Sequence, residues 1–428
     1  MVSLNKDQYL KLLKTQLNKL NFVPEDKFNS ALEILKDVDV IGFDIDFTLL
    51  VYNKKNMIQL MYESICKFLI NQKNYPKIIE YEYHKDYIQS FSHKGFVMDY
   101  KNGNTLKLRN DKSIIKGYHG KKELTKDEIN TIYDNGKFHL FKKSDTAFND
   151  SFYMNIDNFH VQNPALFNIC VDFFDNGQLK VIKCYKDIIA HISEAINYNF
   201  WIKNFENFST FGYIFPEIYN HPELYLDKNN FEQLLIKLKE KGKRLFIATN
   251  SNYSYSNFAL EKTLGKNYDK YFDLCFFKCS KPRFFIETCD KIKCFFLDET
   301  EFYDKELNDE IYQKILNGNK HLSGGSYYLV ERFFEKMLNK NNNKYLYIGD
   351  NILSDCKVVS VLPRWYSLFI YDDLKLQSNI DNSDDNDNDK NCLNDEKDKY
   401  CNIFSIYFQD KDCLFCLPDV EGLKYLIN

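Results

Sequence analysis

The amino-acid sequence predicts an α/β protein with a parallel sheet at its core and a large inserted domain. Four short apolar segments each end abruptly in polar residues, and three of them follow a plausible helix, as in parallel α/β units. Roughly 200 residues separate the first two segments, which is too many for one crossover helix, so an inserted domain is needed there. The chain has 428 residues, which suggests two or three folding units at ~100–200 residues per domain.

The predicted core strands are short and stop where polar residues begin. They span residues 38–43, 245–248, 272–277 and 345–348. Before the second strand, Asn230 can cap a helix and Gly242 can stop it. One face of this helix is apolar and carries Phe231, Leu234, Leu235 and Leu238. Because open parallel sheets bind ligands outside the carboxyl ends of their strands, we expect the chemistry at these polar strand ends.

The inserted domain is predicted to span residues 53–226, which leaves 1–52 and 227–428 for the core. Residues 95–100 and 105–108 flank a segment that contains Asn102-Gly103, a strong hairpin signal, so we expect a hairpin near 95–108. Residues 164–174 and 185–198 look helical and rich in aromatic side chains. The insertion is therefore expected to be mostly helical.

A run of Asp and Asn with almost no apolar residue occupies residues 379–399. Such a composition cannot bury enough surface to order itself, so we predict a disordered acidic loop. Apolar residues resume at 403–408, which makes this loop internal to the core domain.

Charge and hydropathy exclude two broad classes of partner. The 57 Lys and Arg residues against 61 Asp and Glu give a net charge of −4, which argues against a nucleic-acid polymer. No apolar run reaches the ~18 residues that span a membrane. Residues 4–20 interleave leucines with lysines and predict a docking helix, with a membrane-surface helix or a transit peptide as the alternative.

The 12 cysteines are far too few for a disulfide scaffold, and no apolar signal segment opens the sequence. We therefore expect reduced thiols and a cytoplasmic protein. The closest pairs, Cys275/Cys279 and Cys413/Cys416, have no second pair at zinc-finger spacing, so a structural metal is not favoured.

The strongest local signal is the pair Asp44 and Asp46, directly after the first strand. Residues two apart on an extended chain face the same side, so these carboxylates can converge on one small volume. Two carboxylates placed together repel each other unless a cation lies between them, and Mg²⁺ prefers such oxygen ligands. The alternative is a pair of exposed acidic turn residues.

Three further motifs follow later strands in the same way. Thr249-Asn250 closes the second strand and offers hydroxyl and amide donors for phosphate oxygens. Lys281 supplies a positive charge after the third strand. Asp350 and Asp355 follow the fourth strand and add two carboxylates, one of them positioned to join the metal. Each motif alone would be an ordinary turn, but their order and context together are specific.

This set of four motifs resembles the haloacid dehalogenase superfamily of phosphohydrolases, whose motifs stand in the same order on a doubly wound sheet. More local features are similar to one branch, the cytosolic purine 5'-nucleotidase family of the IMP-GMP specific type. The resemblance runs from about residue 40 to 370. It is carried by residues 42–49, 52, 248–255, 281–285, 323–326 and 347–350 of the core, and by 103–107, 119–120 and 171–174 of the insertion.

The resemblance implies a Mg²⁺-dependent 5'-nucleotidase with a haloacid dehalogenase-like Rossmannoid core and an inserted cap. Asp44 would be the nucleophile that forms an aspartyl phosphate, and Asp46 the general acid and base. Thr249 and Lys281 would hold the phosphoryl oxygens. Mg²⁺ would bind Asp44, the backbone carbonyl of Asp46 and Asp350.

Other residues would support the metal or the substrate. Asp355 would orient Lys281 or a metal-bound water, and Asn250 would help to bind the substrate. Phe159 aligns with an aromatic residue that stacks on the nucleobase in related enzymes, with an ordinary core aromatic as the alternative. At Ser193 and Asn197 the sequence departs from its purine-selective relatives, which carry an Arg and an Asp there, so the base preference stays open.

The expected function is hydrolysis of purine nucleoside 5'-monophosphates, with a small-molecule nucleotide as the partner. One alternative is a phosphatase of another small phosphorylated metabolite that uses the same core. Another is a catalytically silent nucleotide-binding or scaffold protein. The family also implies assembly as a homo-oligomer, although no residue in this sequence establishes it.

Overall fold

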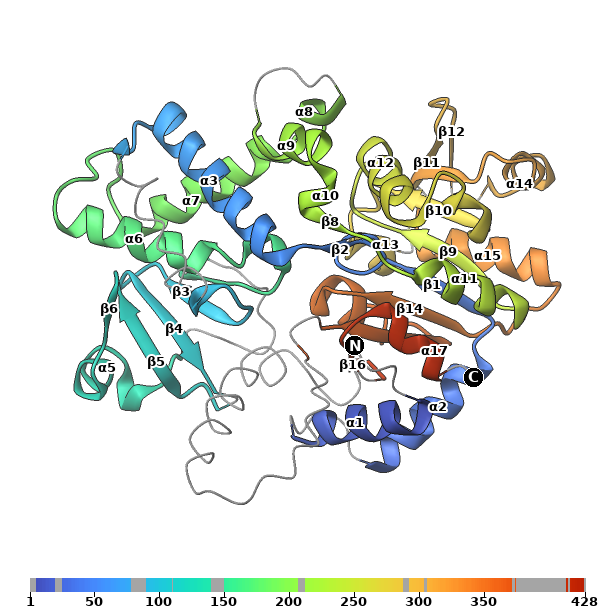
Figure 1. Ribbon diagram of the computed structural model, residues 1–428, viewed down its shortest axis with the longest axis horizontal. Helices are drawn as coiled ribbons and strands as arrows, with labels where there is room; N and C mark the ends of the chain where they lie inside the picture. The colour runs from blue at the N-terminus through green and yellow to red at the C-terminus, as the bar shows by residue number, and fades with distance from the viewer. Residues whose placement is uncertain are drawn as a thin grey trace. The chain divides into compact units, whose positions relative to one another are not determined.

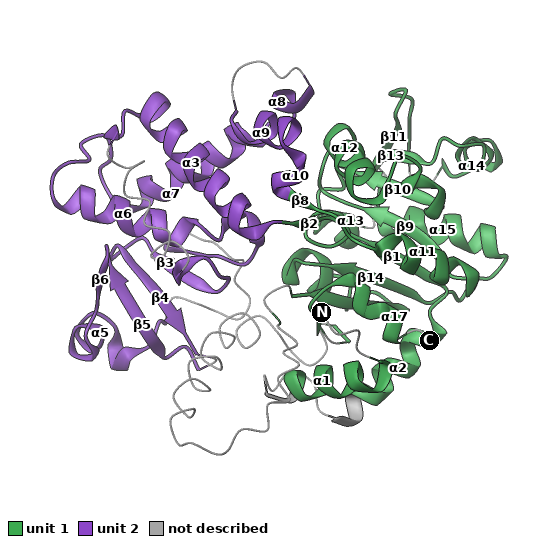
Figure 2. Cartoon of the chain, viewed as in Figure 1, with its two compact units in different colours: residues 1–52, 226–382, 409–428 green, residues 53–225, 383–408 purple. Residues whose placement is uncertain are grey.

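The computed structural model describes residues 5–19, 25–77, 90–109, 111–139, 150–206, 212–287, 292–303, 306–371, 374, 413–414 and 416–426. These residues divide into two compact units (Figure 2). Unit 1 contains the described residues up to Tyr52 and from Leu226 onward, and unit 2 contains those between Asn53 and Tyr225. The predicted acidic loop, 379–399, lies outside the described residues.

Unit 1 is built on a nine-stranded sheet in the order β12-β11-β13-β10-β9-β1-β14-β15-β16 (Figure 1). Its strands are β1 (Val40–Phe43), β9 (Arg244–Ala248), β10 (Leu274–Phe277), β11 (Lys293–Phe296), β12 (Glu301–Tyr303), β13 (His321–Gly324), β14 (Tyr345–Gly349), β15 (Trp365–Ile370) and β16 (Cys416–Leu417). All four strands expected from the sequence are present, as β1, β9, β10 and β14. The α/β class is therefore confirmed.

The sheet is mixed, which corrects the prediction of a parallel sheet. From β13 to β16 every neighbouring pair of strands is parallel. At one edge, β11 runs antiparallel to β13, and β12 runs antiparallel to β11. Four residues, 297–300, connect β11 to β12. The two strands therefore form a hairpin, which needs no crossover.

One face of this sheet is covered by α13 (Arg283–Ile286), α14 (Asp309–Leu316) and α15 (Tyr327–Leu338). Alternate residues along the strands, such as Phe246 and Ala248 of β9, pack into the same cluster as Phe333 and Phe334 of α15. These side chains are fully or almost fully buried, so the sheet is held rigidly beneath the loops that follow its strands.

Helix α11 (Phe231–Glu240) buries the four apolar residues that its sequence predicts. Asn230 stands at the predicted N-cap position, but its side chain makes no capping hydrogen bond. Instead, Asn229 Oδ1 accepts a hydrogen bond from the backbone amide of Phe231 at 3.1 Å. The preceding Asn thus satisfies one of the free amides at the helix start.

The remaining helical segments of unit 1 are α1 (Lys6–Lys19), α2 (Glu25–Asp37), α12 (Tyr253–Leu264), η4 (Tyr268–Tyr271), η6 (Ile352–Lys357), η7 (Val420–Gly422) and α17 (Leu423–Leu426). Helix α1 buries Tyr9, Leu13 and Leu17, and the Tyr9 ring stacks on Tyr425 of α17 at 4.3 Å between centroids. The N-terminal segment therefore docks on the core through one apolar face, as the spacing of its leucines predicts.

The chain passes between the units through two short strands of unit 1. β2 (Val51–Tyr52) precedes the insertion and β8 (Leu226–Asp227) follows it, and the two pair antiparallel with Tyr52 opposite Leu226. The chain therefore leaves and re-enters the core at one place.

Unit 2 contains a five-stranded antiparallel sheet in the order β6-β5-β4-β3-β7. Its strands are β3 (Phe96–Asp99), β4 (Asn104–Leu108), β5 (Ile114–His119), β6 (Lys122–Glu123) and β7 (Phe152–Met154). The predicted hairpin is confirmed as β3 and β4, with Asp99 opposite Asn104. The other three strands add a sheet that the prediction of a mostly helical insertion did not contain.

The helical segments of unit 2 are α3 (Lys54–Lys73), α5 (Lys126–Ile132), η2 (Asp134–Gly136), η3 (Asn158–His160), α6 (Asn163–Asp175), α7 (Tyr185–Asn199), α8 (Lys203–Glu206), α9 (Ile214–Asn220) and α10 (Pro222–Tyr225). The core of the unit forms where α3, α6 and α7 pack together with residues of β3. Helix α6 is buried almost all round, which its predominantly apolar sequence requires.

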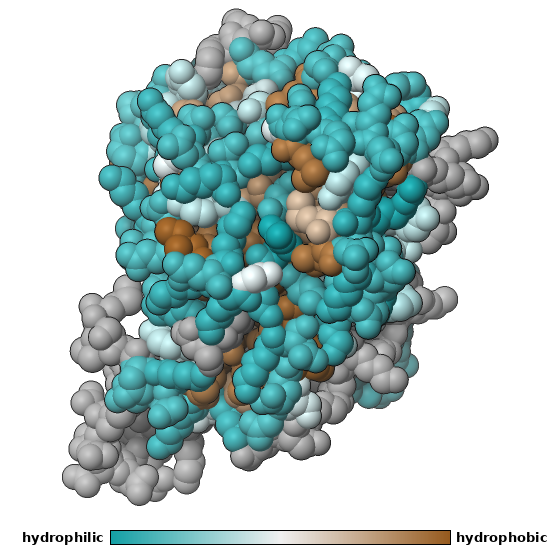
Figure 3. Space-filling view, turned by 90° about the vertical axis from the view of Figure 1, so that its right-hand side faces the viewer, coloured by the Kyte–Doolittle hydropathy of each residue, from teal (hydrophilic) through white to brown (hydrophobic). Residues whose placement is uncertain are grey.

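Among the described residues, none of the helices combines the length and apolarity needed to cross a membrane. The face seen in Figure 3 is mostly hydrophilic, and its hydrophobic residues lie in small groups.

Candidate active site

The candidate site lies at the carboxyl ends of four adjacent parallel strands, β10, β9, β1 and β14. Asp44 directly follows β1, Thr249 follows β9, and Asp350 follows β14, whereas Lys281 comes four residues after β10. After β1 the chain adds β9 and β10 on one side of it and later adds β14 and β15 on the other side. The site therefore lies at a point where the strand order reverses. The topology thus brings together motifs that are about 300 residues apart in sequence.

Three buried carboxylates form the centre of the site. Asp44, Asp350 and Asp355 each offer an oxygen, and these oxygens lie within 4.8 Å of one another. Asp355 is completely buried, and Asp44 and Asp350 are 8% and 7% exposed. Like charges this close in a poorly solvated volume repel strongly unless cations compensate them.

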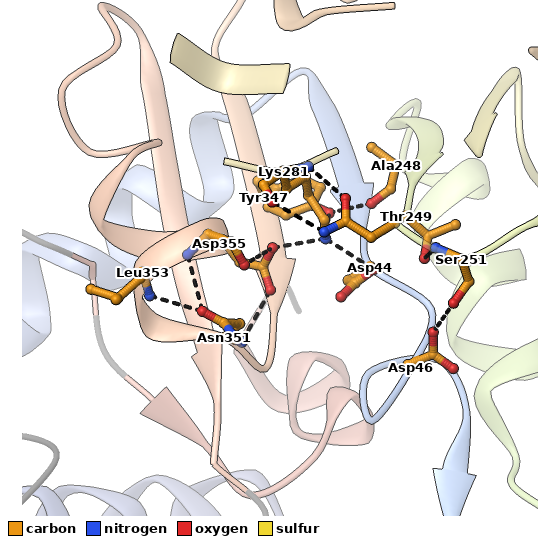
Figure 4. Close-up of polar contacts among 12 residues, drawn as sticks. Asp44, Asp46, Ala248, Thr249, Ser251, Lys281, Tyr347, Asn351, Leu353 and Asp355 are labelled. Carbon is orange, nitrogen blue, oxygen red and sulfur yellow. Dashed lines mark hydrogen bonds and ion pairs between the residues drawn. The ribbon is translucent and has the colours of Figure 1, made fainter. Parts of the chain in front are cut away.

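Lys281 is the cation that the structure provides for this cluster. Its Nζ lies 3.0 Å from Asp44 Oδ1 and 2.8 Å from Asp355 Oδ1 (Figure 4). It also donates a hydrogen bond to the hydroxyl of Tyr347 at 2.8 Å, and Tyr347 donates to the carbonyl of Ala248 at 2.5 Å. An ammonium has three protons, so these three contacts use all of them and fix the side chain.

The buried charges change the pKa values of the groups that carry them. Burial, opposed by Lys281 and aided by the nearby Asp355 and Asp46, raises the pKa of Asp44 to about 7. Burial would lower the pKa of Lys281, but Asp355 and Asp44 raise it well above its ordinary value. Lys281 is therefore charged at neutral pH, and Asp44 is easily protonated when only Lys281 compensates it.

Asp46 lies close by but has different partners. Its Oδ2 accepts a hydrogen bond from Ser251 Oγ at 2.5 Å, and its Oδ1 accepts one from the Tyr52 hydroxyl at 2.6 Å. Its side chain points toward Ser251 (Figure 4). Burial raises the pKa of Asp46, and the bonds from Ser251 and Tyr52 lower it in part. A raised pKa favours the protonated form of the carboxyl, which a general acid needs.

Thr249 and Asn250 shape the loop opposite the carboxylates. Thr249 is 1% exposed, and its Oγ1 accepts a hydrogen bond from the amide of Ser251 at 3.1 Å. The side chain of Asn250 binds the backbone of Lys281 twice, accepting from its amide at 2.5 Å and donating to its carbonyl at 3.1 Å. In this structure the Asn250 side chain thus holds the Lys281 loop in place.

The loop after β14 is built to bury Asp355. Asn351 Oδ1 accepts hydrogen bonds from the amides of Leu353 and Ser354 at 3.1 and 3.0 Å, which caps the short helix η6. The amide of Asn351 in turn donates to Asp355 Oδ2 at 3.0 Å. A side chain at Gly349 would collide with the Asp355 carboxylate, so only glycine fits there.

The predicted residues of the insertion belong to unit 2. Phe159 lies in η3, is half-buried, and meets the ring of Phe200 edge to face at 5.3 Å between centroids. Ser193 and Asn197 are both exposed and lie one turn apart on α7, so they share one face of that helix.

Several residues of the site were not assigned a role from the sequence. Tyr347 and Asn351 lie next to predicted residues, and the Asn-x-x-Ser pattern of the latter could have indicated a helix cap. Tyr52 bonds to Asp46, and Tyr255, which is 203 positions from Tyr52 in the sequence, meets the Tyr52 hydroxyl only in the folded chain. No local pattern signals such a contact.

The donor set fits a divalent cation. Lys281 forms ion pairs with two of the three carboxylates, and its single charge cannot balance all three when they are ionised. Buried carboxylate oxygens are the ligands that Mg²⁺ prefers, and a second cation would favour the ionised form of Asp44. The residues at the strand ends therefore form a buried acidic centre suited to a metal ion.

Comparison with known proteins agrees with this geometry. Residues 28–410 match the model of the 5' nucleotidase family. The human 5'-nucleotidase domain-containing protein 1 is 29% identical over 347 residues, which cover 79% of this chain and 72% of the human protein. A 5'-nucleotidase domain-containing protein of Dictyostelium discoideum is 26% identical over 404 residues, which cover 90% of this chain and 62% of that protein.

The rat 5'-nucleotidase domain-containing protein 2 is 24% identical over 358 residues, 82% of this chain and 60% of the rat protein. The family model spans all four strand-end motifs, from Asp44 to Asp355. The chain therefore belongs to the 5' nucleotidase family and is a phosphoric monoester hydrolase.

Proposed function

We propose that this protein is a Mg²⁺-dependent 5'-nucleotidase that hydrolyses purine nucleoside 5'-monophosphates through an aspartyl phosphate on Asp44. We further propose that unit 1 is a haloacid dehalogenase-like core and that residues 53–226 act as its cap. The observation that carries the proposal is the meeting of Asp44, Lys281 and the second acidic pair at adjacent strand ends. Membership of the 5' nucleotidase family supports the substrate class.

In the first half-reaction, an oxygen of Asp44 attacks phosphorus and forms a new P–O bond. The bond from phosphorus to the 5' oxygen breaks, and its electron pair stays on that oxygen. Asp46 gives its proton to the leaving oxygen, so the nucleoside departs as a neutral alcohol. The raised pKa of Asp46 supports this role, because the carboxyl must hold a proton before the bond breaks.

In the second half-reaction, Asp46 takes a proton from the water that attacks the phosphorus of the aspartyl phosphate. Phosphate leaves and the Asp44 carboxylate is restored. Throughout, Lys281 and the Thr249 hydroxyl hold the phosphoryl oxygens. Asp44, the Asp46 backbone carbonyl and Asp350 would hold Mg²⁺, which neutralises charge on the nucleophile and the phosphoryl group. Asp355 keeps Lys281 oriented through the ion pair at 2.8 Å.

The proposed preference for purines rests on side chains of the insertion. Phe159 offers a half-buried aromatic face for a base, whereas Ser193 and Asn197 offer no charge to read it. Stacking favours the larger purine face but tolerates every base. We therefore expect purine nucleotides to be favoured without strict selection. The small share of cysteines in the sequence supports a cytoplasmic location.

A phosphate-release screen over nucleoside 5'-monophosphates and sugar phosphates, with Mg²⁺ and with chelator, tests the proposal. We expect release from IMP, GMP and AMP with Mg²⁺ and none with chelator. Asp44→Asn is the control for contaminating phosphatases. A sugar phosphate that outperforms every nucleotide would replace the substrate class while keeping the phosphatase core. Release from no substrate would favour a nucleotide-binding protein without activity.

A further inference from the structure

The carboxylate of Asp46 is held by hydroxyl groups at both oxygens. Ser251 donates to Oδ2 at 2.5 Å and Tyr52 donates to Oδ1 at 2.6 Å. Asp46 is 8% exposed and Tyr52 is 5% exposed, so solvent competes little for these bonds. Hydrogen bonds to a buried carboxylate are stronger than those between neutral groups, and two of them fix its rotation.

A second tyrosine extends this contact away from the site. The hydroxyls of Tyr52 and Tyr255 lie 2.9 Å apart, and Tyr255 is also 5% exposed. A phenol has one proton. Because Tyr52 gives its proton to Asp46, Tyr255 must donate to Tyr52. The bonds therefore run in one direction, from Tyr255 to Tyr52 to Asp46.

Contacts within the local fold hold Tyr52 beside Asp46. The chain folds back after Asp46, where the amide of Leu50 donates to the carbonyl of Ile45 at 2.8 Å. The ring of Phe47 packs on the ring of Tyr52 at 4.7 Å between centroids. Tyr52 also belongs to β2, which pairs with Leu226 of β8. Tyr255 lies in the first turn of α12.

We infer that Tyr52, backed by Tyr255, is a positioning residue that fixes the Asp46 carboxyl for proton transfer to the leaving oxygen. This inference rests on the proposed function, in which Asp46 is the general acid. Tyr52 does not exchange its own proton with substrate. It holds Oδ1 of Asp46 and so fixes the orientation of the carboxyl group. Oδ2, which can carry the proton while it accepts from Ser251, then serves the oxygen whose bond to phosphorus breaks.

The effect of Tyr52 on the rate of ester cleavage should depend on the leaving group. An alkoxide such as the 5' oxygen of a nucleoside leaves poorly unless it is protonated, whereas p-nitrophenolate spreads its charge and leaves without a proton. A residue that positions the general acid therefore matters for the nucleotide and little for the aryl ester. A residue that only supports the fold affects both substrates equally.

The test compares kcat/KM for a nucleoside 5'-monophosphate and for p-nitrophenyl phosphate with Tyr52→Phe, Tyr255→Phe and Asp46→Asn. This constant reports the steps up to release of the first product, so hydrolysis of the phosphoenzyme does not enter it. Tyr268→Phe is the matched control, because it also removes the hydroxyl of a buried tyrosine. That hydroxyl donates to Asn257 at 3.0 Å and not to Asp46.

We expect Tyr52→Phe to lower the nucleotide constant about 10- to 100-fold and the aryl constant less than about 3-fold. Tyr255→Phe should show the same selective loss at about 2- to 10-fold, and Asp46→Asn a larger one. Tyr268→Phe should change the ratio of the two constants very little. Tyr255→Phe also keeps the test open if Tyr52→Phe fails to fold.

Equal losses on both substrates, or no loss on either, with Tyr52→Phe and Tyr255→Phe would overturn the inference. If Asp46→Asn itself shows no selectivity, the proposed role of Asp46 as the acid fails instead. If the wild-type protein cleaves neither ester, the proposed function fails. The three failures thus give different results.

Discussion

The two units use their buried polar side chains in different ways. In unit 1, the carboxylates at the strand ends face one ammonium and keep an excess of negative charge. In the sheet region of unit 2, polar groups satisfy one another: Thr105 donates to Asn168 at 2.6 Å, and Tyr133 donates to Asp99 at 2.7 Å. The first arrangement is costly unless a ligand completes it, and the second holds a fold together. The acidic centre of unit 1 is therefore arranged to bind a ligand, whereas the polar contacts of unit 2 stabilise its fold.

The largest expected effect is the loss of turnover in Asp44→Asn. The change keeps the size of the side chain but removes the nucleophilic oxygen, so we expect activity to fall at least about 10⁴-fold. Initial rates of phosphate release on the best substrate measure it. Turnover within tenfold of the wild type would remove Asp44 from the role of nucleophile.

The same variant should make the metal-free protein more stable above neutral pH. The pKa of Asp44 is about 7 in the folded protein and near its ordinary value when unfolded. The folded state thus binds more protons between about pH 4 and 7, so wild-type stability falls as the pH rises through that window. Melting temperatures in chelator at pH 8 should be higher for Asp44→Asn, by several degrees. A lower value would contradict the excess of charge at this site.

Removal of the metal should abolish activity and lower stability together. A ligand present at about 100 times its Kd stabilises the folded state by about 2.7 kcal/mol, which corresponds to several degrees in Tm. We expect Mg²⁺ to raise the Tm of the wild type and to restore activity after chelation. Asp350→Asn should lose most of both responses. Full activity in chelator would show that the acidic cluster serves another purpose.

We expect the insertion to discriminate only loosely among nucleotide bases. Since Ser193 and Asn197 are uncharged and exposed, we expect kcat/KM for IMP, GMP, AMP and UMP to lie within about two orders of magnitude, with purines ahead. Phe159→Ala should weaken all four together. A preference for IMP above about 10⁴-fold would show that other residues supply specific polar contacts.

The smallest expected effect concerns the ion pair beside Phe159. Asp157 Oδ2 lies 2.6 Å from Nδ1 of His160. Burial would lower the pKa of His160, but Asp157 raises it above its ordinary value. The stability from this pair is therefore present below pH 6.5 and is lost as the pH rises through the raised pKa.

Asp157→Asn removes the charge but can still accept the bond from the Phe159 amide. We expect the Tm advantage of the wild type over this variant, worth about 1 kcal/mol or less, to shrink between pH 6 and 8.5. Melting curves of both proteins across this range measure it. An advantage that grows with pH would contradict the charged pair.

The core strands and the residues that follow them could be predicted from the sequence because both signals are local. An apolar run of four to six residues identifies each strand, and in β1, β9 and β14 the residue directly after the strand belongs to the site. The edge strands β11 and β12 escaped prediction because they are short and each begins with a charged residue, Lys293 or Glu301. In the insertion, β6 consists of Lys122 and Glu123 alone and carries no hydrophobic signal.

The support of the site could not be predicted in this way. The contact between Tyr52 and Tyr255 joins segments 203 positions apart, and the bonds from Asn250 to Lys281 depend on two loops that meet only in the folded sheet. Such pairs follow from the strand order, which the sequence alone does not specify. The roles assigned to Phe159, Ser193 and Asn197 stay predictions.

The most direct test of the central claim is to trap the phosphoenzyme. Wild-type protein with Mg²⁺ and its best substrate is quenched in acid within the first turnover, reduced with borohydride and digested for mass spectrometry. An aspartyl phosphate at the nucleophile is converted to homoserine, so we expect homoserine in place of Asp44 and none in the absence of substrate. Homoserine at another acidic residue, or an unmodified Asp44 during active turnover, would contradict the account.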